Sequence, residues 1–136
     1  MSDDQDGRIV RHYHKEENMS WIRRSEDVKV NDRQAVQNGP GHMISQSLAE
    51  NDGELNDKGR LLAHNTLNKN CGVGWHVHEG DTEIYIILKG EAEYNDNGTI
   101  TTVKAGDVTF TDDGEGHSIT NKKDEPVEFI ALILYK

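Results

Sequence analysis

The sequence predicts a single all-β domain built as a sandwich or barrel, and three observations support this prediction. The chain has 136 residues, a length that suits one domain. It contains 13 glycines against two prolines, with short apolar runs between turns rich in glycine, asparagine and aspartate. Only 33% of its residues are hydrophobic, so a compact core must be surrounded by many polar loops. Closely spaced short apolar runs are typical of β proteins and not of helical ones.

The first 20 residues are polar, charged and without periodicity. We therefore expect residues 1–20 to form a flexible N-terminal arm and residues 21–136 to form the folded barrel. His12 and His14 lie in this arm without a glutamate at a useful spacing, and we interpret them as solvated rather than metal-binding. The N-terminal third leaves room for one short helix.

The remaining chain predicts about ten strands separated by turns. Residues 38–41 (Asn-Gly-Pro-Gly) form a strong turn signal, and residues 95–98 (Asn-Asp-Asn-Gly) suit a hairpin. The expected strands, in chain order, are 28–30, 43–48, 60–67, 73–78, 83–88, 91–94, 99–103, 108–111, 117–120 and 127–135.

Two of these strands are apolar on both faces. Residues 84–88 (Ile-Tyr-Ile-Ile-Leu) and 129–134 (Phe-Ile-Ala-Leu-Ile-Leu) contain no alternating polar positions. A strand with one face in water should alternate. We therefore expect their outer faces to be covered, either by the N-terminal segment or by a second subunit, and we favour a homodimer.

The net charge of the chain limits the classes of molecule that it is expected to bind. The formal net charge is −10, from 25 acidic and 15 basic residues. Such a surface repels phosphate backbones and anionic lipids, so we expect neither nucleic acid nor membranes as partners. An anionic small molecule stays compatible with this charge, because a buried metal ion dominates its local field. The sequence has no signal peptide and no long apolar stretch, which predicts a cytoplasmic protein.

The segment from His76 to Glu83 predicts a metal site. Residues two apart on a strand point to one face, so His76 and His78 should point the same way. A tight turn then starts the next strand, on which Glu83 returns to that face. Two imidazoles and a carboxylate suit a divalent transition metal and leave coordination positions open. His117, on a distant strand, is well placed to supply the fourth ligand.

The same residues resemble the two motifs of the cupin superfamily. The first motif is His-x-His, three or four residues, Glu, six residues and Gly. This chain matches it with His76, His78, Glu83 and Gly90. The second motif is Gly, five residues, Pro-x-Gly, two residues, His, three residues and Asn. This chain matches its spacing with Gly106, Asp112, Gly114, His117 and Asn121.

Two positions depart from these motifs. Asn70 stands where the first motif opens with Gly, and Asp112 stands where the second has Pro. Both positions concern loop shape more than metal binding. The resemblance is to small, single-domain bacterial cupins, and it implies a double-stranded β-helix barrel, or jelly roll. It also implies one divalent transition metal (Mn, Fe, Ni, Co or Zn) held by His76, His78, Glu83 and His117.

The resemblance further implies a small oxygen-rich ligand, a carboxylate or a hydroxy or keto compound, chelated to the metal. Cupins include dioxygenases, isomerases, decarboxylases and lyases, and we favour an enzyme. Tyr85 should share the inner face with Glu83, and both are candidate catalytic residues for proton transfer, although Tyr85 could equally be a barrel-lining aromatic. Two alternatives stay open. One is a non-catalytic, metal-dependent ligand-binding protein, and the other is β-elimination as in the dimethylsulfoniopropionate lyases, whose first motif is similar.

Other residues near the motifs are predicted to be structural. Ile87, Phe110 and Phe129 are expected in the pocket wall or core. Trp75 has the opposite parity to the motif histidines and should pack away from the metal, and Cys71 is expected to be a buried thiol.

Overall fold

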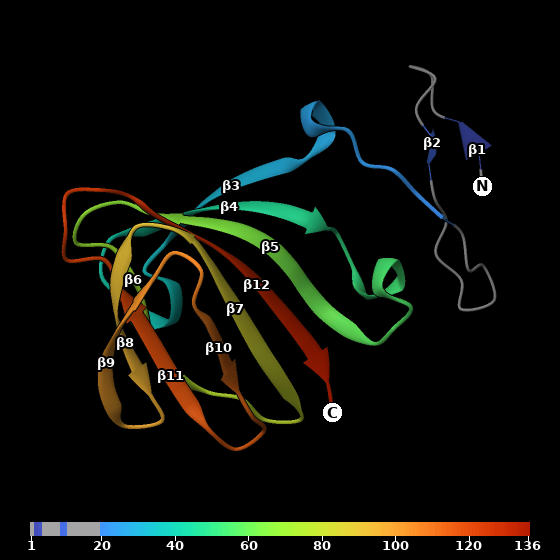
Figure 1. Ribbon diagram of the computed structural model, residues 1–136. Coiled ribbons are helices and arrows are strands. Elements are labelled where there is room, and N and C mark those ends of the chain that lie inside the picture. The colour runs from blue at the N-terminus through green and yellow to red at the C-terminus, as the bar shows by residue number, and fades with distance from the viewer. Residues whose placement is uncertain (1, 4–8, 11–19) are drawn as a thin grey trace.

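The computed structural model describes residues 2–3, 9–10 and 20–136 (Figure 1). Two short strands, β1 (Ser2–Asp3) and β2 (Ile9–Val10), pair with each other in antiparallel fashion. His12 and His14 lie outside the described residues, and the flexible arm stays a prediction.

Residues 29–135 form two antiparallel sheets. The six-stranded sheet has the order β10-β7-β12-β5-β4-β3, and the four-stranded sheet has the order β6-β11-β8-β9. The strands are β3 (Lys29–Gln34), β4 (His42–Ala49), β5 (Gly59–Leu67), β6 (Gly72–Val77), β7 (Asp81–Lys89), β8 (Glu91–Asp96), β9 (Thr99–Lys104), β10 (Val108–Thr111), β11 (Gly116–Thr120) and β12 (Val127–Tyr135). Each strand expected from the sequence overlaps one of these, which confirms the all-β prediction.

The helical segments of the described chain are three short 3₁₀ turns. They are η1 (Ser25–Asp27), η2 (Val36–Asn38) and η3 (Asp52–Leu55). Among the described residues, no helix is long and apolar enough to cross a membrane. In place of the short helix allowed for the N-terminal third, the described residues of that third contain only the 3₁₀ turns η1 and η2.

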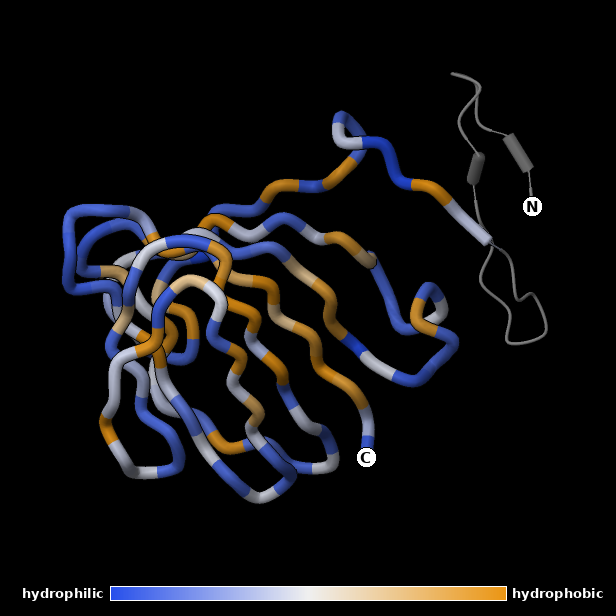
Figure 2. The backbone as a smooth tube through the Cα atoms, in the orientation of Figure 1, coloured by the Kyte–Doolittle hydropathy of each residue, from blue (hydrophilic) through white to orange (hydrophobic). Residues whose placement is uncertain are grey.

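The core lies between the two sheets. Leu67, Ile87 and Phe129 of the six-stranded sheet and Ile119 of the four-stranded sheet are fully or almost fully buried. Burial of each such side chain contributes about 1.5–3 kcal/mol. Figure 2 shows the corresponding pattern, with hydrophobic residues along the strands and hydrophilic residues in most connecting loops. The core positions predicted for Ile87 and Phe129 are confirmed.

The two departures from the motifs concern loops. Asn70 adopts a left-handed backbone with φ of 63°, a conformation that glycine takes freely and that asparagine tolerates better than most residues.

Asn121, at the end of the second motif, is fully buried, and its amide donates hydrogen bonds to the carbonyl oxygens of Leu67 (3.0 Å) and Glu125 (2.9 Å). The motif asparagine therefore fixes loops at one end of the barrel.

The outer side of β7 and β10 is apolar and exposed. Ile86, Leu88, Val108 and Phe110 are between 40% and 64% exposed. The prediction that Phe110 lines the pocket or the core is wrong. On β10 it is Thr111 that is buried, and Phe110, of opposite parity, points outward. The absence of alternation in residues 84–88 thus corresponds to a strand with a buried inner face and an exposed apolar outer face.

Candidate metal centre

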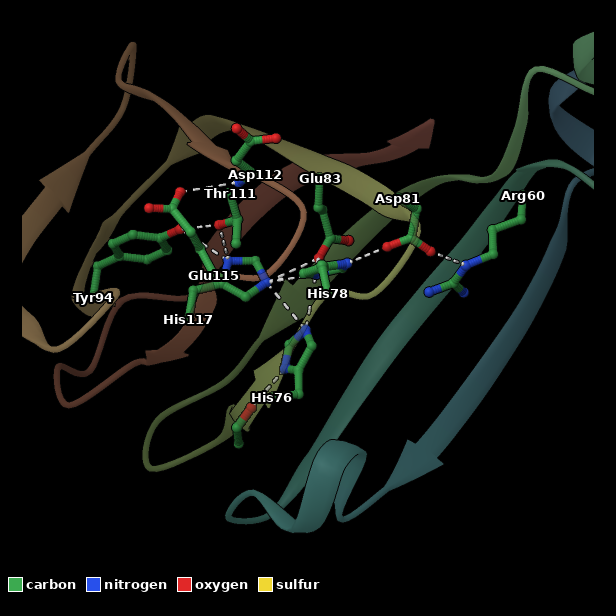
Figure 3. A network of polar contacts seen from close by, with 11 residues as sticks. Arg60, His76, His78, Asp81, Glu83, Tyr94, Thr111, Asp112, Glu115 and His117 are labelled. Atoms are coloured by element: carbon green, nitrogen blue, oxygen red, sulfur yellow. Dashed lines mark hydrogen bonds and ion pairs between the residues drawn. The ribbon is translucent and has the colours of Figure 1, made fainter. Parts of the chain in front are cut away.

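The four predicted metal ligands converge between the two sheets (Figure 3). His76 lies on β6, His78 follows β6 directly, Glu83 lies on β7 and His117 on β11. Antiparallel pairing places His76 directly opposite His117. One donor atom from each of the four residues lies within 4.8 Å of the others.

The distances within this cluster are short. The Nε2 atom of His117 is 3.0 Å from that of His76 and 3.2 Å from that of His78. Glu83 Oε1 is 3.0 Å from His117 Nε2, 3.1 Å from His78 Nε2 and 3.7 Å from His76 Nε2. His78, Glu83 and His117 are buried, and His76 is partly open to solvent. The arrangement presents three imidazole nitrogens and one carboxylate oxygen to a common point.

Hydrogen bonds on the far side of two rings orient their Nε2 atoms. His76 Nδ1 donates to the carbonyl oxygen of Gly74 at 2.8 Å, and His78 Nδ1 donates to Asp81 Oδ1 at 2.7 Å. Since carbonyl and carboxylate oxygens only accept, the proton sits on Nδ1, and the Nε2 lone pair is free for a metal. Asp81 is itself fixed by Arg60, whose Nε donates to Oδ2 at 2.8 Å.

The third imidazole is oriented by hydroxyl groups. His117 Nδ1 lies 2.9 Å from both the Tyr94 hydroxyl and the Thr111 hydroxyl, and these two oxygens are 3.2 Å apart. Either hydroxyl oxygen can accept a proton from Nδ1, and in that tautomer Nε2 is unprotonated at the centre. The partners of His76 and His78 thus fix the tautomer that suits a metal, and the partners of His117 are compatible with it.

The electrostatics of the cluster also suit a cation. Burial lowers the pKa of His117, which favours its neutral form. Burial alone would raise the pKa of Glu83, but hydrogen bonds with His117, His76 and His78 outweigh it and hold this pKa well below its usual range. Metal ligation needs neutral imidazoles and an ionised carboxylate. The ionised Glu83 and the neutral His117 are favoured here, whereas the hydrogen bond with Glu83 raises the pKa of His78, so a metal would have to displace a proton from that ring. The absence of thiolate donors matches Mn, Fe, Co, Ni or Zn rather than a softer metal.

Tyr85 lies beside the cluster, as its parity predicted. Its side chain is buried, and its ring stacks on that of His117 with a centroid distance of 4.8 Å and an interplanar angle of 28°. The Tyr85 ring also contacts that of Phe129, with a centroid distance of 4.6 Å. Burial, together with the charge of Glu83, raises the pKa of Tyr85 well above its usual value. The phenol is therefore protonated at neutral pH and serves as a hydrogen-bond donor more readily than as a base.

Three residues near the motifs in the sequence lie outside the centre. The Trp75 ring packs over Gly116, where an added Cβ would come within 2.4 Å of it, and the side chain is half exposed. His64 pairs with Glu128 at 3.1 Å between Nε2 and Oε1. Cys71 is buried, as expected.

Sequence reasoning missed the residues that orient the ligands. Asp81 falls in the tight turn between His78 and Glu83, and a carboxylate three residues after a histidine is within reach of its ring. Tyr94 and Thr111 occupy buried, inward positions on β8 and β10. Their parity on these strands was the available signal, and the spacing of the motifs does not include them.

The fold and the centre define a cupin. The family model described as a cupin domain matches residues 64–133. The chain also shares 38% identity over 118 residues with a curated protein, covering 87% of this chain and 97% of that relative. The chain therefore belongs to the cupin family.

Two of the similar proteins have names that refer to oxalate. The curated protein is the oxalate-binding protein of Thermotoga maritima. The crystal structure of a predicted oxalate decarboxylase from Thermotoga maritima is similar to this chain with a TM-score of 0.81 at 38% identity, covering 85% of this chain and all of that one. A cupin-2 domain protein from Rhodospirillum rubrum has a TM-score of 0.68 at 16% identity, over 86% of this chain and 75% of that one, and shares the fold alone.

Proposed function

We propose that the protein binds one divalent transition metal through His76, His78, Glu83 and His117, and that the metal holds a small carboxylate of the oxalate type. The observation that carries this proposal is the convergence of three Nε2 atoms and one carboxylate oxygen within 4.8 Å. The hydrogen bonds on Nδ1 of His76 and His78 support it, because they leave both Nε2 lone pairs directed at this point, and the hydroxyl partner of His117 Nδ1 is compatible with the same tautomer.

The charge of the centre favours an anion. A divalent ion beside the single carboxylate of Glu83 leaves one positive charge in excess, in a buried site where charges act strongly. Four protein ligands leave positions open on an ion that prefers six, and two oxygens of one small ligand would fill them. The oxalate-binding relative, at 38% identity, supports oxalate as the ligand to test first.

The same centre suits catalysis, which is the second candidate. The bound ion would supply Lewis-acid chemistry toward the ligand oxygens. Tyr85, protonated and stacked on His117, would donate a hydrogen bond or a proton, and Glu83 would stay ionised as a ligand. Conversion of hydrogen oxalate to carbon dioxide and formate needs one proton returned to carbon and no external oxidant. Catalytic roles for Tyr85 and Glu83 stay predictions.

Elemental analysis tests the metal proposal. Protein purified without a nickel column should carry about one equivalent of a transition metal, and His76→Ala/His117→Ala should carry none. His64→Ala is the matched control, because His64 lies away from the cluster, and it should keep the metal. Equal metal content in the double variant and the wild type would contradict the proposed ligands.

Oxalate titration tests the ligand and separates binding from catalysis. The metal-loaded protein should bind oxalate, and the chelator-treated protein should not. Formate and carbon dioxide released on incubation would identify a decarboxylase, whereas stable binding without product would identify a binding protein. No binding of oxalate to the loaded protein would contradict the proposed ligand class.

We also propose that two copies pair through the outer apolar face, defined as Ile84, Ile86, Leu88, Val108 and Phe110. Phe110 lies opposite Ile84 and Val108 opposite Ile86, so the face is continuous across β7 and β10. It contains no charged residue, and a chain of net charge −10 can approach its own copy there without like-charge repulsion. A two-fold dimer would cover the same face on both copies.

A further inference from the structure

Among the three histidines of the cluster, His78 depends most on side-chain support. His76 and His117 lie directly opposite each other in the antiparallel ladder of β6 and β11. His78 instead follows the end of β6, and its backbone N–H donates to the carbonyl oxygen of Glu115 in the loop before β11. The direction of its ring is set by Asp81, whose Oδ1 lies 2.7 Å from Nδ1. The position of the His78 donor atom therefore depends on how firmly Asp81 is held.

The Asp81 carboxylate is held from two sides. Oδ1 accepts from the His78 ring, and Oδ2 accepts from Nε of Arg60 at 2.8 Å (Figure 3). Asp81 is only 6% exposed, and a buried carboxylate is costly unless a positive group pairs with it. With a partner on each oxygen, the carboxylate cannot rotate without losing one of its two hydrogen bonds. Arg60 therefore fixes the plane in which Asp81 meets His78.

The backbone of β5 is irregular at Arg60. In the pairing of β5 with β12, Leu61 lies opposite Ile133, and Gly59 lies opposite Leu134. Arg60 is thus one extra residue between two consecutive pairs, which is the arrangement of a β-bulge. A bulge changes the direction of a side chain, and bulges are frequent beside functional sites for this reason. The irregularity in β5 falls on the residue that contacts Asp81.

Gly59 allows β5 to lie close to β12 at this bulge. A Cβ atom added to Gly59 would come within 2.5 Å of the carbonyl oxygen of Ile133, so a larger residue does not fit. Strand β12 lies between β5 and β7 in the six-stranded sheet. Arg60 on β5 therefore has to reach across β12 to meet Asp81 on β7, and the close approach of the two strands shortens that span.

We propose that Arg60 is a positioning residue of the metal centre, which raises the affinity for the metal by holding Asp81 and, through it, the ring of His78. This inference rests on the proposed metal site. The chain of contacts from Arg60 through Asp81 to His78 ties β5 of the six-stranded sheet to the end of β6 in the four-stranded sheet. It thereby holds a ligand of one sheet relative to Glu83 of the other. The Arg60 side chain is 47% exposed, so its substitution leaves no cavity in the core.

Competition for zinc against a chelator of known affinity tests the inference. Arg60→Gln should weaken zinc affinity about 3- to 10-fold, because it loosens the support of His78 without removing the Asp81 carboxylate. Arg60→Lys should recover part of this loss, since it keeps the charge and one donor. Lys58→Gln is the matched control, because it removes the same charge from an exposed position two residues away. It should leave zinc affinity within about twofold of the wild type.

A double variant shows whether Arg60 acts through Asp81. In the Asp81→Asn background, Arg60→Gln should change zinc affinity by less than about twofold, because the group that transmits its effect is already lost. An equal loss in both backgrounds, an unchanged affinity in Arg60→Gln, or an equal effect of Lys58→Gln would each overturn the role of Arg60 and leave the proposed metal site intact. A wild type that binds no zinc would overturn the site as well, and titration of the wild type alone identifies this case.

Discussion

The two faces of β7 both reverse the usual pattern, in which polar side chains are exposed and apolar side chains are buried. On the inner face, Glu83 and Tyr85 are polar and buried, and their neighbours include the three ligand histidines. On the outer face, Ile86 and Leu88 are apolar and exposed. Buried polar groups are costly unless they are paired, and exposed apolar groups gain nothing until they are covered. The proposed cation would complete the inner face, and the proposed second copy would cover the outer one.

Alternation along β7 places the residues of the metal cluster on one face of the strand and the proposed dimer contact on the other. A shift of register by one residue would exchange the faces, placing Glu83 outside and Ile84 in the cluster. Pairing of β7 with both β10 and β12 fixes this register from two sides. The substitutions below act on one face at a time.

The largest expected effect comes from a pair of phenylalanines on opposite sides of the sheet. Phe129 is fully buried, and Phe129→Ala should lower the free energy of unfolding by about 3–5 kcal/mol, because it leaves a cavity in the core. Phe110 is 55% exposed, and Phe110→Ala should change it by less than about 0.5 kcal/mol in dilute protein. Urea unfolding of both variants at low protein concentration makes the comparison. Equal losses would show that the outer face contributes to the stability of the single chain.

The second prediction concerns the outer apolar face. Phe110→Asp places a charge on this face and should weaken self-association on the order of 100-fold, because the same charge would be buried twice across a two-fold axis. Light scattering coupled to size-exclusion chromatography should show a dimer for the wild type and a monomer for the variant. Metal content should stay the same, since the Phe110 side chain lies on the outer face of the sheet and the metal cluster on the inner face. An unchanged mass for the variant would contradict the proposed interface.

The third prediction concerns the support of the metal ligands. Asp81→Asn should weaken metal affinity about 10- to 100-fold, because Asp81 fixes the tautomer and orientation of His78. Competition with a chelator of known affinity measures the change. Asp124→Asn is the control, since Asp124 is an exposed carboxylate that pairs with Lys69. An effect of equal size in the control would trace the loss to the net charge of the chain rather than to His78.

The sequence was sufficient for the fold class and for the four clustered residues, for physical reasons. The spacing of His76, His78 and Glu83 translates into one face through the period of a strand, and that period is insensitive to the rest of the fold. The strands were likewise marked by short apolar runs between turns. Phe110 was misplaced because an apolar residue was assumed to lie inside, whereas on β10 the polar Thr109 and Thr111 face inward and the apolar Val108 and Phe110 face outward.

The residues that orient the ligands were less accessible from the sequence. Tyr94 and Thr111 meet His117 only because β8 pairs with β11 while β10 pairs with β7 in the other sheet. These contacts depend on which strands are neighbours, and a single sequence gives little information about pairing between distant strands.

The smallest expected effect tests whether the hydroxyls around His117 act redundantly. Tyr94→Phe should weaken metal affinity by less than about tenfold, because the Thr111 hydroxyl still lies 2.9 Å from Nδ1 and can accept its proton. Thr111→Val should behave similarly, since the Tyr94 hydroxyl then stays in place. The double variant should lose more than the two single losses combined, about 10- to 100-fold, because only then is the imidazole without an acceptor to fix its tautomer. Chelator competition on the four proteins completes the cycle. If Tyr94→Phe alone matched the double variant, the phenol would be the sole support of His117, and the inner face would depend on one hydroxyl group rather than two.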